Sequence, residues 1–160
     1  EECKQFDAII CEPIGVSNPK FMKVLKHGFK NLLKDPSIIF NQKKQTIKLH
    51  FDMCHGYGII DSAIDVMHSK DKVDFKNFIY NSISFNPHIV FISKPNIANR
   101  WFSDLFSWLD NCEKIIGFKK LKGYEKRLYA YLAERYLSFW FKKYTNSIDW
   151  PLITVDIENI

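Results

Sequence analysis

One helix in the second half of the sequence combines an apolar surface with a stripe of polar and charged residues. Residues 124–143 are apolar almost all round apart from their start, which predicts a helix buried on most sides. At about 100° per residue, five residues lie on or beside an arc of roughly 60°: Arg127, Tyr131, Glu134, Arg135 and Ser138. Buried carboxylates and guanidinium groups need partners, so this stripe either closes an internal ion-pair network or lines a water-filled cleft.

A second concentration of reactive side chains lies between His50 and Gly58. It joins two imidazoles, a carboxylate and a thiol to a turn with two glycines: His50, Asp52, Cys54, His55, Gly56 and Gly58. A glycine-rich turn lets a ligand approach the backbone, so His55 or Asp52 could bond a sugar hydroxyl or act as a general base. The spacing matches no standard zinc motif, and ordinary loop histidines at the end of a strand are the simpler interpretation. We predict no metal ligands.

Several other chemistries lack their sequence motifs. No Gly-x-Ser-x-Gly elbow supports serine hydrolase catalysis, and no Walker phosphate loop is present. Gly56 and Gly58 lack the third glycine and the βαβ context of a dinucleotide-binding fingerprint. The aromatic residues and lysines of segment 139–144 could stack bases, but their helical spacing is explained more simply as core and rim. We therefore predict no nucleic-acid partner.

Length and composition indicate a single folded domain over residues 1–160. The chain is 46% hydrophobic, 16% aromatic and 26% charged, with a net charge of +5, which excludes disordered and low-complexity proteins. No run approaches the roughly 18 apolar residues that span a bilayer, and the first residues lack a signal-peptide pattern. We expect a cytoplasmic protein whose four scattered cysteines are reduced thiols.

The elements that must position these residues are expected to be a mixture of helices and strands. Apolar runs predict strands at residues 6–11, 46–51, 87–95 and 150–155. Helical spacing predicts helices at residues 19–34, 60–67, 71–83, 97–116 and 124–143. The run between Pro87 and Pro95 is the expected central strand, buried on both faces, with His88 as a satisfied core histidine. The apolar face of the first helix, expected to pack inward, consists of Phe21, Leu25, Phe29 and Leu32.

Taken together, three of these segments resemble the C-terminal half of capsule-type glycosyltransferases. That family has long been described as a domain of unknown function in capsular and lipopolysaccharide gene clusters. The resemblance rests on the strand Val90-Phe91-Ile92-Ser93-Lys94, the helix with Trp108-Leu109, and Gly123-Tyr124 with Tyr131-Leu132-Ala133-Glu134-Arg135. The opening strand at Phe6–Ile10 is also similar to the family's Tyr-Asp-Ile-Ile strand, and His55 matches a histidine in its middle segment.

The chain departs from the family pattern in two places. Ile89 stands where the family usually has Asn before its Met-Phe-Ile strand, and His88 is one residue further back. The upstream half of the relatives, with a His-Tyr-Arg-Arg segment and the nucleotide-sugar-binding strands, has no counterpart in this sequence. The resemblance therefore implies that residues 1–160 are the acceptor-side, C-terminal part of a longer enzyme.

The resemblance implies a GT-A-like fold, α/β and helix-rich, in which a few short strands form part of the glycosyltransferase sheet. It implies transfer of a sugar from a nucleotide-sugar donor to a growing capsular or lipooligosaccharide glycan. A divalent metal, Mn²⁺ or Mg²⁺, could assist the complete enzyme, which could lie at the inner face of the cytoplasmic membrane. The catalytic candidates are His55, Asp52 and Glu134. The substrate-binding candidates are Arg127, Tyr131, Arg135 and His88.

A function of another class stays open. The chain could be a non-catalytic α/β module whose aromatic surface docks a saccharide or a protein partner. The two functions differ in whether the complete gene product contains a nucleotide-binding half.

Overall fold

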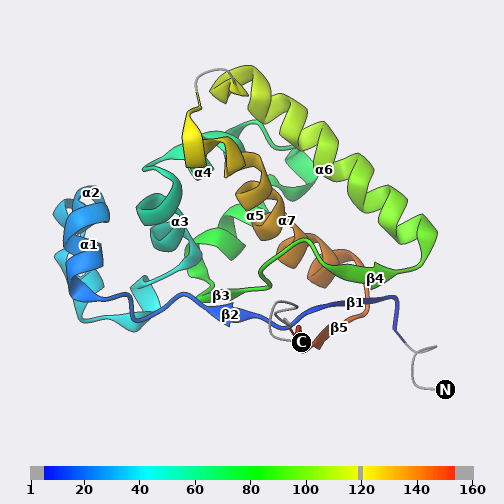
Figure 1. Ribbon diagram of the computed structural model, residues 1–160, viewed down its shortest axis with the longest axis horizontal. Helices are drawn as coiled ribbons and strands as arrows, with labels where there is room; N and C mark the ends of the chain where they lie inside the picture. Colours follow the sequence, from blue (N-terminus) through cyan, green and yellow to red (C-terminus); the bar gives the residue numbers. More distant parts are fainter. Residues whose placement is uncertain (1–5, 119–120, 154–160) are drawn as a thin grey trace, which may run out of the picture.

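Helices lie on one side of a small mixed sheet in the computed structural model of the protein, which describes residues 6–118 and 121–153 (Figure 1). The sheet has the order β4 (Phe91–Ser93), β1 (Ala8–Cys11) and β5 (Ser147–Trp150); β1 is antiparallel to β4 and parallel to β5. A separate two-stranded ladder pairs β2 (Ile14–Gly15) with β3 (Ser84–Phe85). The prediction of a helix-rich α/β chain is confirmed.

The described residues also form seven α-helices. They are α1 (Phe21–His27), α2 (Phe29–Lys34), α3 (Ile47–His55), α4 (Ile59–Asp65), α5 (Ser69–Asn81), α6 (Pro95–Ile116) and α7 (Leu128–Tyr144). Short 3₁₀ turns occupy Pro36–Ile39, Gln42–Lys44 and Gly123–Arg127. No helix among residues 6–118 and 121–153 is long and apolar enough to cross a bilayer.

The main core lies where α5, α6 and α7 pack together. The predicted apolar stripe of α6 is confirmed, because Trp101, Leu105, Trp108 and Cys112 are all buried. The predicted helix of residues 124–143 is also confirmed as α7, except that its first turn is a 3₁₀ turn, and most of its residues are buried. The helices predicted at residues 60–67 and 71–83 are confirmed as α4 and α5.

The expected central strand at residues 87–95 is wrong. Only Phe91–Ser93 forms a strand, and it lies at an edge of the sheet, whereas β1 occupies the middle. Ile92 is 71% exposed, so this run is not buried on both faces. The chain bends at His88, which has a φ of +64° and an exposed side chain, so the expectation of a core histidine is wrong as well. The two prolines therefore lie on either side of a turn and a short edge strand.

The strand expected at residues 46–51 is instead the start of helix α3. Ile47 and Phe51 belong to the main core, while Leu49 and Met53 belong to a smaller cluster with Val24. Residues two apart on a helix point in nearly opposite directions, so a helix held between two apolar clusters shows the same alternation as a strand. The period of two therefore came from packing on both sides of α3.

The helix expected at residues 19–34 is broken into α1 and α2 at Gly28. Gly28 lies against α3, and a Cβ added there would be 3.2 Å from Met53 Cγ and 2.9 Å from the Val24 carbonyl oxygen. The predicted inward apolar face is wrong for Phe21 and Phe29, which are exposed, whereas Leu25 and Leu32 are half-buried. The buried residue of the two helices is Val24. Val24 packs into the smaller cluster with Leu49 and Met53 of α3, and Lys30 and Lys34 lie over the Tyr57 ring.

The closing strand lies earlier than expected. β5 ends at Trp150, so it overlaps the predicted strand at residues 150–155 by one residue, while Thr154 and Val155 lie outside the described residues. Because β1 pairs with β5, the sheet brings the two ends of the described chain together beneath α7 (Figure 1).

The cysteines of the described part, Cys11, Cys54 and Cys112, are free thiols, as predicted.

Candidate functional site

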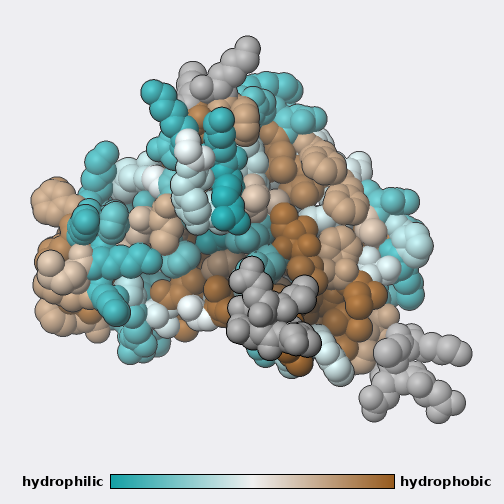
Figure 2. Space-filling model, in the orientation of Figure 1, coloured by the Kyte–Doolittle hydropathy of each residue, from teal (hydrophilic) through white to brown (hydrophobic). Residues whose placement is uncertain are grey.

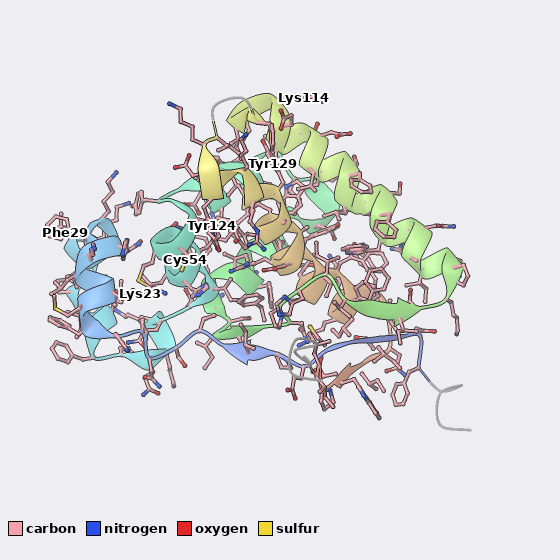
Figure 3. The ribbon with its side chains drawn as sticks, in the orientation of Figure 1. Lys23, Phe29, Cys54, Lys114, Tyr124 and Tyr129 are labelled. Atoms are coloured by element: carbon pink, nitrogen blue, oxygen red, sulfur yellow. The ribbon has the colours of Figure 1, made fainter. Side chains whose placement is uncertain are left out.

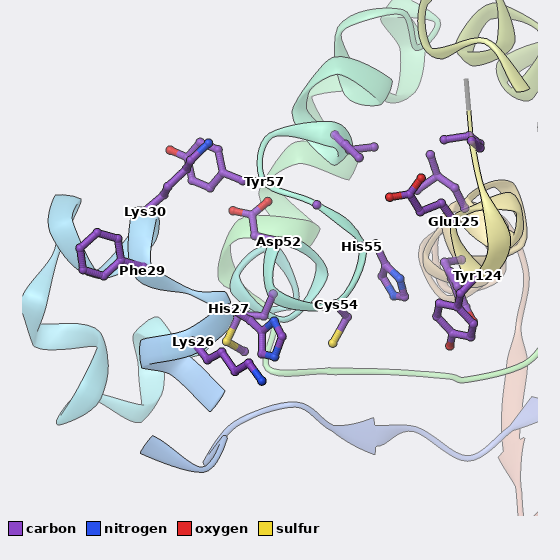
Figure 4. Close-up of a pocket in the computed structure, with 16 residues that line it drawn as sticks. Lys26, His27, Phe29, Lys30, Asp52, Cys54, His55, Tyr57, Tyr124 and Glu125 are labelled. Carbon is purple, nitrogen blue, oxygen red and sulfur yellow. The ribbon is translucent and has the colours of Figure 1, made fainter. Parts of the chain in front are cut away.

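Two adjoining hollows surround the C-terminal end of α3 and face the beginning of α7. Figure 4 shows the residues that line the larger one. Their volumes are about 660 Å³ and about 470 Å³. Residues that line both of them are His27, Met53, Cys54, His55, Tyr124 and Tyr131. Because the hollows share these walls, they form one depression, which is termed the cleft.

The polar stripe of α7 serves both of the purposes that the sequence left open. The Arg135 guanidinium is 2% exposed, and its Nη1 donates to Glu134 Oε2 at 2.8 Å and to the Tyr131 carbonyl oxygen at 3.2 Å. Its carbon Cζ lies 4.1 Å from the ring centroid of Phe85. The Glu134 side chain is 17% exposed and lines the smaller hollow. Arg135 thus belongs to an internal network, while Glu134 connects that network to the cleft.

Arg135 fixes the tautomer of a second group, the half-buried His50. Arg135 Nη2 lies 3.4 Å from His50 Nδ1, and a guanidinium can only donate, so Nδ1 must carry a lone pair and the proton sits on Nε2. His50 Nε2 is 3.8 Å from Cys54 Sγ. Burial, with the charges of Arg135 and Lys23, lowers the pKa of His50 to about 4. His50 is therefore a neutral acceptor that positions Arg135.

His55 lies on the aromatic wall of the cleft. Its ring stacks on Tyr131 with 4.0 Å between centroids and meets the edge of Phe51 at 4.8 Å. Burial, followed by the charge of Arg135, lowers the pKa of His55 to about 3. The imidazole is neutral at pH 7 and can accept a hydrogen bond, but such a low pKa makes it a weak general base.

These two histidines predict a loss of stability in acid. Their folded pKa values lie below the ordinary value of 6.5, so the unfolded chain binds more protons as the pH falls below 6.5. His50 is expected to remove about 2 kcal/mol from the free energy of unfolding by about pH 5, and the more exposed His55 less, because solvent screens its charge. Urea unfolding of the native chain and of His50→Gln and His55→Gln across pH 7.5 to 5 measures this. The prediction is contradicted if the free energy of unfolding of both variants depends on pH as steeply as that of the native chain.

The Asp52 carboxylate is held inside the protein beside the cleft. Its side chain is fully buried, pairs with the Lys48 ammonium and accepts the backbone N–H of Gly58 at 3.2 Å. That bond anchors the turn in which Gly56 and Gly58 have φ values of +111° and +79°, which other residues rarely adopt. Asp52 is thus placed to hold the turn, and Glu134 is more accessible to a ligand.

The remaining substrate-binding candidates, Arg127 and His88, both have exposed side chains. The Arg127 guanidinium is exposed and lies 5.5 Å from the ring centroid of Tyr124 and 5.4 Å from that of Tyr131. His88 is exposed and lines the smaller hollow. Ser138 faces away, since its hydroxyl accepts the backbone N–H of Asn86 at 2.6 Å. The structure therefore gathers His55, His88, Tyr131, Glu134 and Arg135 at one place, with Arg127 beside them.

The sequence did not single out Lys23 as a residue of the cleft. Lys23 of α1 lines the same hollow as Tyr124 before α7 and as Cys54 of α3, which the sequence grouped with His50 and His55 (Figure 3). His50 and Cys54 are one helical turn apart on α3, whereas the sequence predicted a strand for residues 46–51. Lys23 carried no local signal, because only the tertiary structure places α1 beside α3.

Metal binding has no support in the part of the chain that the structure describes. No group of three or more His, Cys, Asp and Glu side chains there is arranged to hold an ion. The divalent metal that the resemblance allows for a complete enzyme has no ligand set among these residues.

Comparison with known proteins places the chain in one family. No curated protein and no solved structure matches it significantly. A family model described as a domain of unknown function, DUF4422, matches residues 15–146, which include every residue of the cleft named above. The chain therefore belongs to the DUF4422 family of domains of unknown function.

Proposed function

We propose that the chain is the acceptor-side part of a GT-A-like glycosyltransferase that moves a sugar from a nucleotide-sugar donor to a capsular or lipooligosaccharide glycan. The proposal combines the sequence resemblance to capsule-type glycosyltransferases with the chemistry of the cleft. The cleft is about 660 Å³ in its larger part, a volume typical of small-molecule sites.

One observation carries the proposal: a carboxylate stands next to an aromatic wall. Tyr124 and Tyr131 have ring centroids 5.6 Å apart, and His55 stacks on Tyr131. Such rings offer apolar faces to the C–H surface of a sugar, while few polar groups orient it. Glu134 lies on the same wall and is oriented by Arg135.

The residues suit the acceptor half of sugar transfer. Glu134 would take the proton of an acceptor hydroxyl as that oxygen attacks the anomeric carbon of the donor. The bond from the anomeric carbon to the nucleotide phosphate oxygen breaks, and the nucleotide leaves with the electron pair. The neutral His55 would accept a hydrogen bond from a second sugar hydroxyl, and Arg127 would bring positive charge to the rim.

A saccharide-binding module without catalysis is the second candidate. The same stacked rings would hold a glycan whether or not a donor binds. The two candidates therefore share the cleft and differ in turnover.

A combined binding and turnover screen tests the proposal. The chain and its complete gene product are heated with UDP-, GDP- or CMP-sugars, with and without Mn²⁺ and capsular oligosaccharides, and released nucleotide is measured. A ligand at about 100 times its dissociation constant stabilises by about 2.7 kcal/mol, which shifts the melting temperature measurably. We expect nucleotide release that requires both donor and oligosaccharide. A shift with oligosaccharide alone and no release by the complete gene product would replace the enzyme with the binding module.

A further inference from the structure

The pair α1 and α2 exposes large apolar side chains that the rest of the protein does not cover. Phe21 is 52% exposed, Met22 70%, Phe29 55% and Leu33 68%. They gather at the end of the molecule formed by these helices, where apolar and strongly hydrophilic side chains lie side by side (Figure 2). Together with the lysines of residues 20–34, these four residues are termed the α1–α2 surface.

The α1–α2 surface is also strongly basic. Residues 20–34 contain five lysines and no acidic residue. None of the ion pairs between described residues involves any of these lysines. Lys30 and Lys34 both place their ammonium groups 5.3 Å from the ring centroid of Tyr57. A hydrogen bond with Tyr57, together with the charges of Asp61 and Asp52, raises the pKa of Lys34, so this lysine is held as a cation.

The two kinds of side chain form parallel stripes. Phe29 and Leu33 are one helical turn apart, and Lys30 and Lys34 form the next stripe around the same helix. On α1, Met22 lies beside Lys23 and one helical turn before Lys26. An apolar stripe bordered by lysines is the pattern of helices that lie in the interface of an anionic membrane, with apolar groups inserted and ammonium groups among the phosphates.

The outer face of the sheet provides a contrast within the same chain. Ile92 of β4 is 71% exposed, and Ile153, which follows β5, is 82% exposed. However, the nearby Lys94 is paired with Asp7 at 2.9 Å. The apolar residues of the α1–α2 surface differ, because they lie among five lysines that form no ion pair with a described residue.

We propose that the α1–α2 surface binds the surface of an anionic lipid bilayer. Lys26, His27, Phe29 and Lys30 also line the larger hollow of the cleft, so the bound bilayer would lie beside its mouth. This arrangement would bring lipid-linked molecules to the cleft. The inference rests on exposure and charge and holds whether or not the cleft transfers sugars.

Vesicle sedimentation tests the inference. The chain is mixed with vesicles of phosphatidylglycerol and phosphatidylcholine in equal parts, or of phosphatidylcholine alone, at low and high salt. We expect binding to the anionic vesicles that weakens as salt is added. Phe29→Ser combined with Leu33→Ser is expected to reduce binding by about tenfold or more, and Lys30→Gln with Lys34→Gln by at least about fivefold.

The matched control is Ile92→Ser combined with Ile153→Ser, which removes equally exposed apolar groups without neighbouring unpaired lysines. Circular dichroism of each variant verifies that its helices remain. The inference is overturned if anionic vesicles do not bind, if neutral vesicles bind equally well, or if the control loses as much binding as the α1–α2 variants. Concentration-dependent dimers that disappear in the Phe29→Ser and Leu33→Ser variant would also overturn it, by showing that a second copy covers the surface.

Discussion

Replacing Glu134 with glutamine is expected to lower sugar transfer by roughly 10²–10⁴-fold, the usual contribution of a positioned general base. The amide keeps the size of the carboxylate, and its oxygen can still accept from Arg135 Nη1, which is now 2.8 Å from Glu134 Oε2. It cannot take a proton from the acceptor hydroxyl. The measurement is nucleotide release by the complete gene product with the donor and oligosaccharide identified by the screen.

Two comparisons make this result decisive. Glu113→Gln changes a carboxylate at the end of α6 that bonds the backbone N–H of Phe118, outside the cleft, and should keep full activity. A bound oligosaccharide should still stabilise Glu134→Gln, because the aromatic wall is intact. Full transfer by Glu134→Gln would assign the base elsewhere, and His55→Gln would then be the variant to examine.

Removing the Glu134 side chain altogether is expected to lower the free energy of unfolding by about 3 kcal/mol or more. Arg135 is 2% exposed, and Glu134 is the one carboxylate paired with it among the described residues. Burial already lowers the pKa of Arg135 to about 10, while Glu134 opposes that shift. Without Glu134, a charged guanidinium would remain inside the protein with two neutral acceptors, His50 Nδ1 and the Tyr131 carbonyl oxygen.

A double variant separates the lost ion pair from general damage to α7. Glu134→Ala combined with Arg135→Met removes both charges and leaves an apolar side chain between Phe51 and Phe85. The double variant should be more stable than Glu134→Ala alone, since the uncompensated charge is gone. Additive losses in urea unfolding would show that Glu134 and Arg135 are not coupled, and the internal network would have to be abandoned.

Long helices with one consistent period were predictable from the sequence. Trp101, Leu105, Trp108 and Cys112 recur at three- and four-residue steps over α6 and all pack inward. The polar stripe of α7 was predictable for the same reason, because a helix of fixed pitch determines which of its residues share a face. The sequence left open whether that stripe was a network or a cleft, and the structure shows that it is both.

Short elements were misjudged where packing overrides local pattern. Alternating apolar residues around Leu49 predicted a strand, yet α3 is a helix held between two clusters. The run around Ile92 predicted a buried strand, yet the pairing of β1 with both β4 and β5 places Ile92 at an exposed edge. Whether an apolar residue is covered depends on neighbours from distant segments, which no local window contains.

By itself, the sequence determined which residues lie together along single helices, including Tyr131 and Glu134 on α7. Only the tertiary structure decided which helices face each other. It brought His50 against Arg135, 85 residues apart in the chain, and so set the tautomer and the low pKa of that histidine. Hydrogen bonding and burial act over a few ångströms in space, so the chemistry of the cleft depends on contacts that sequence distance does not record.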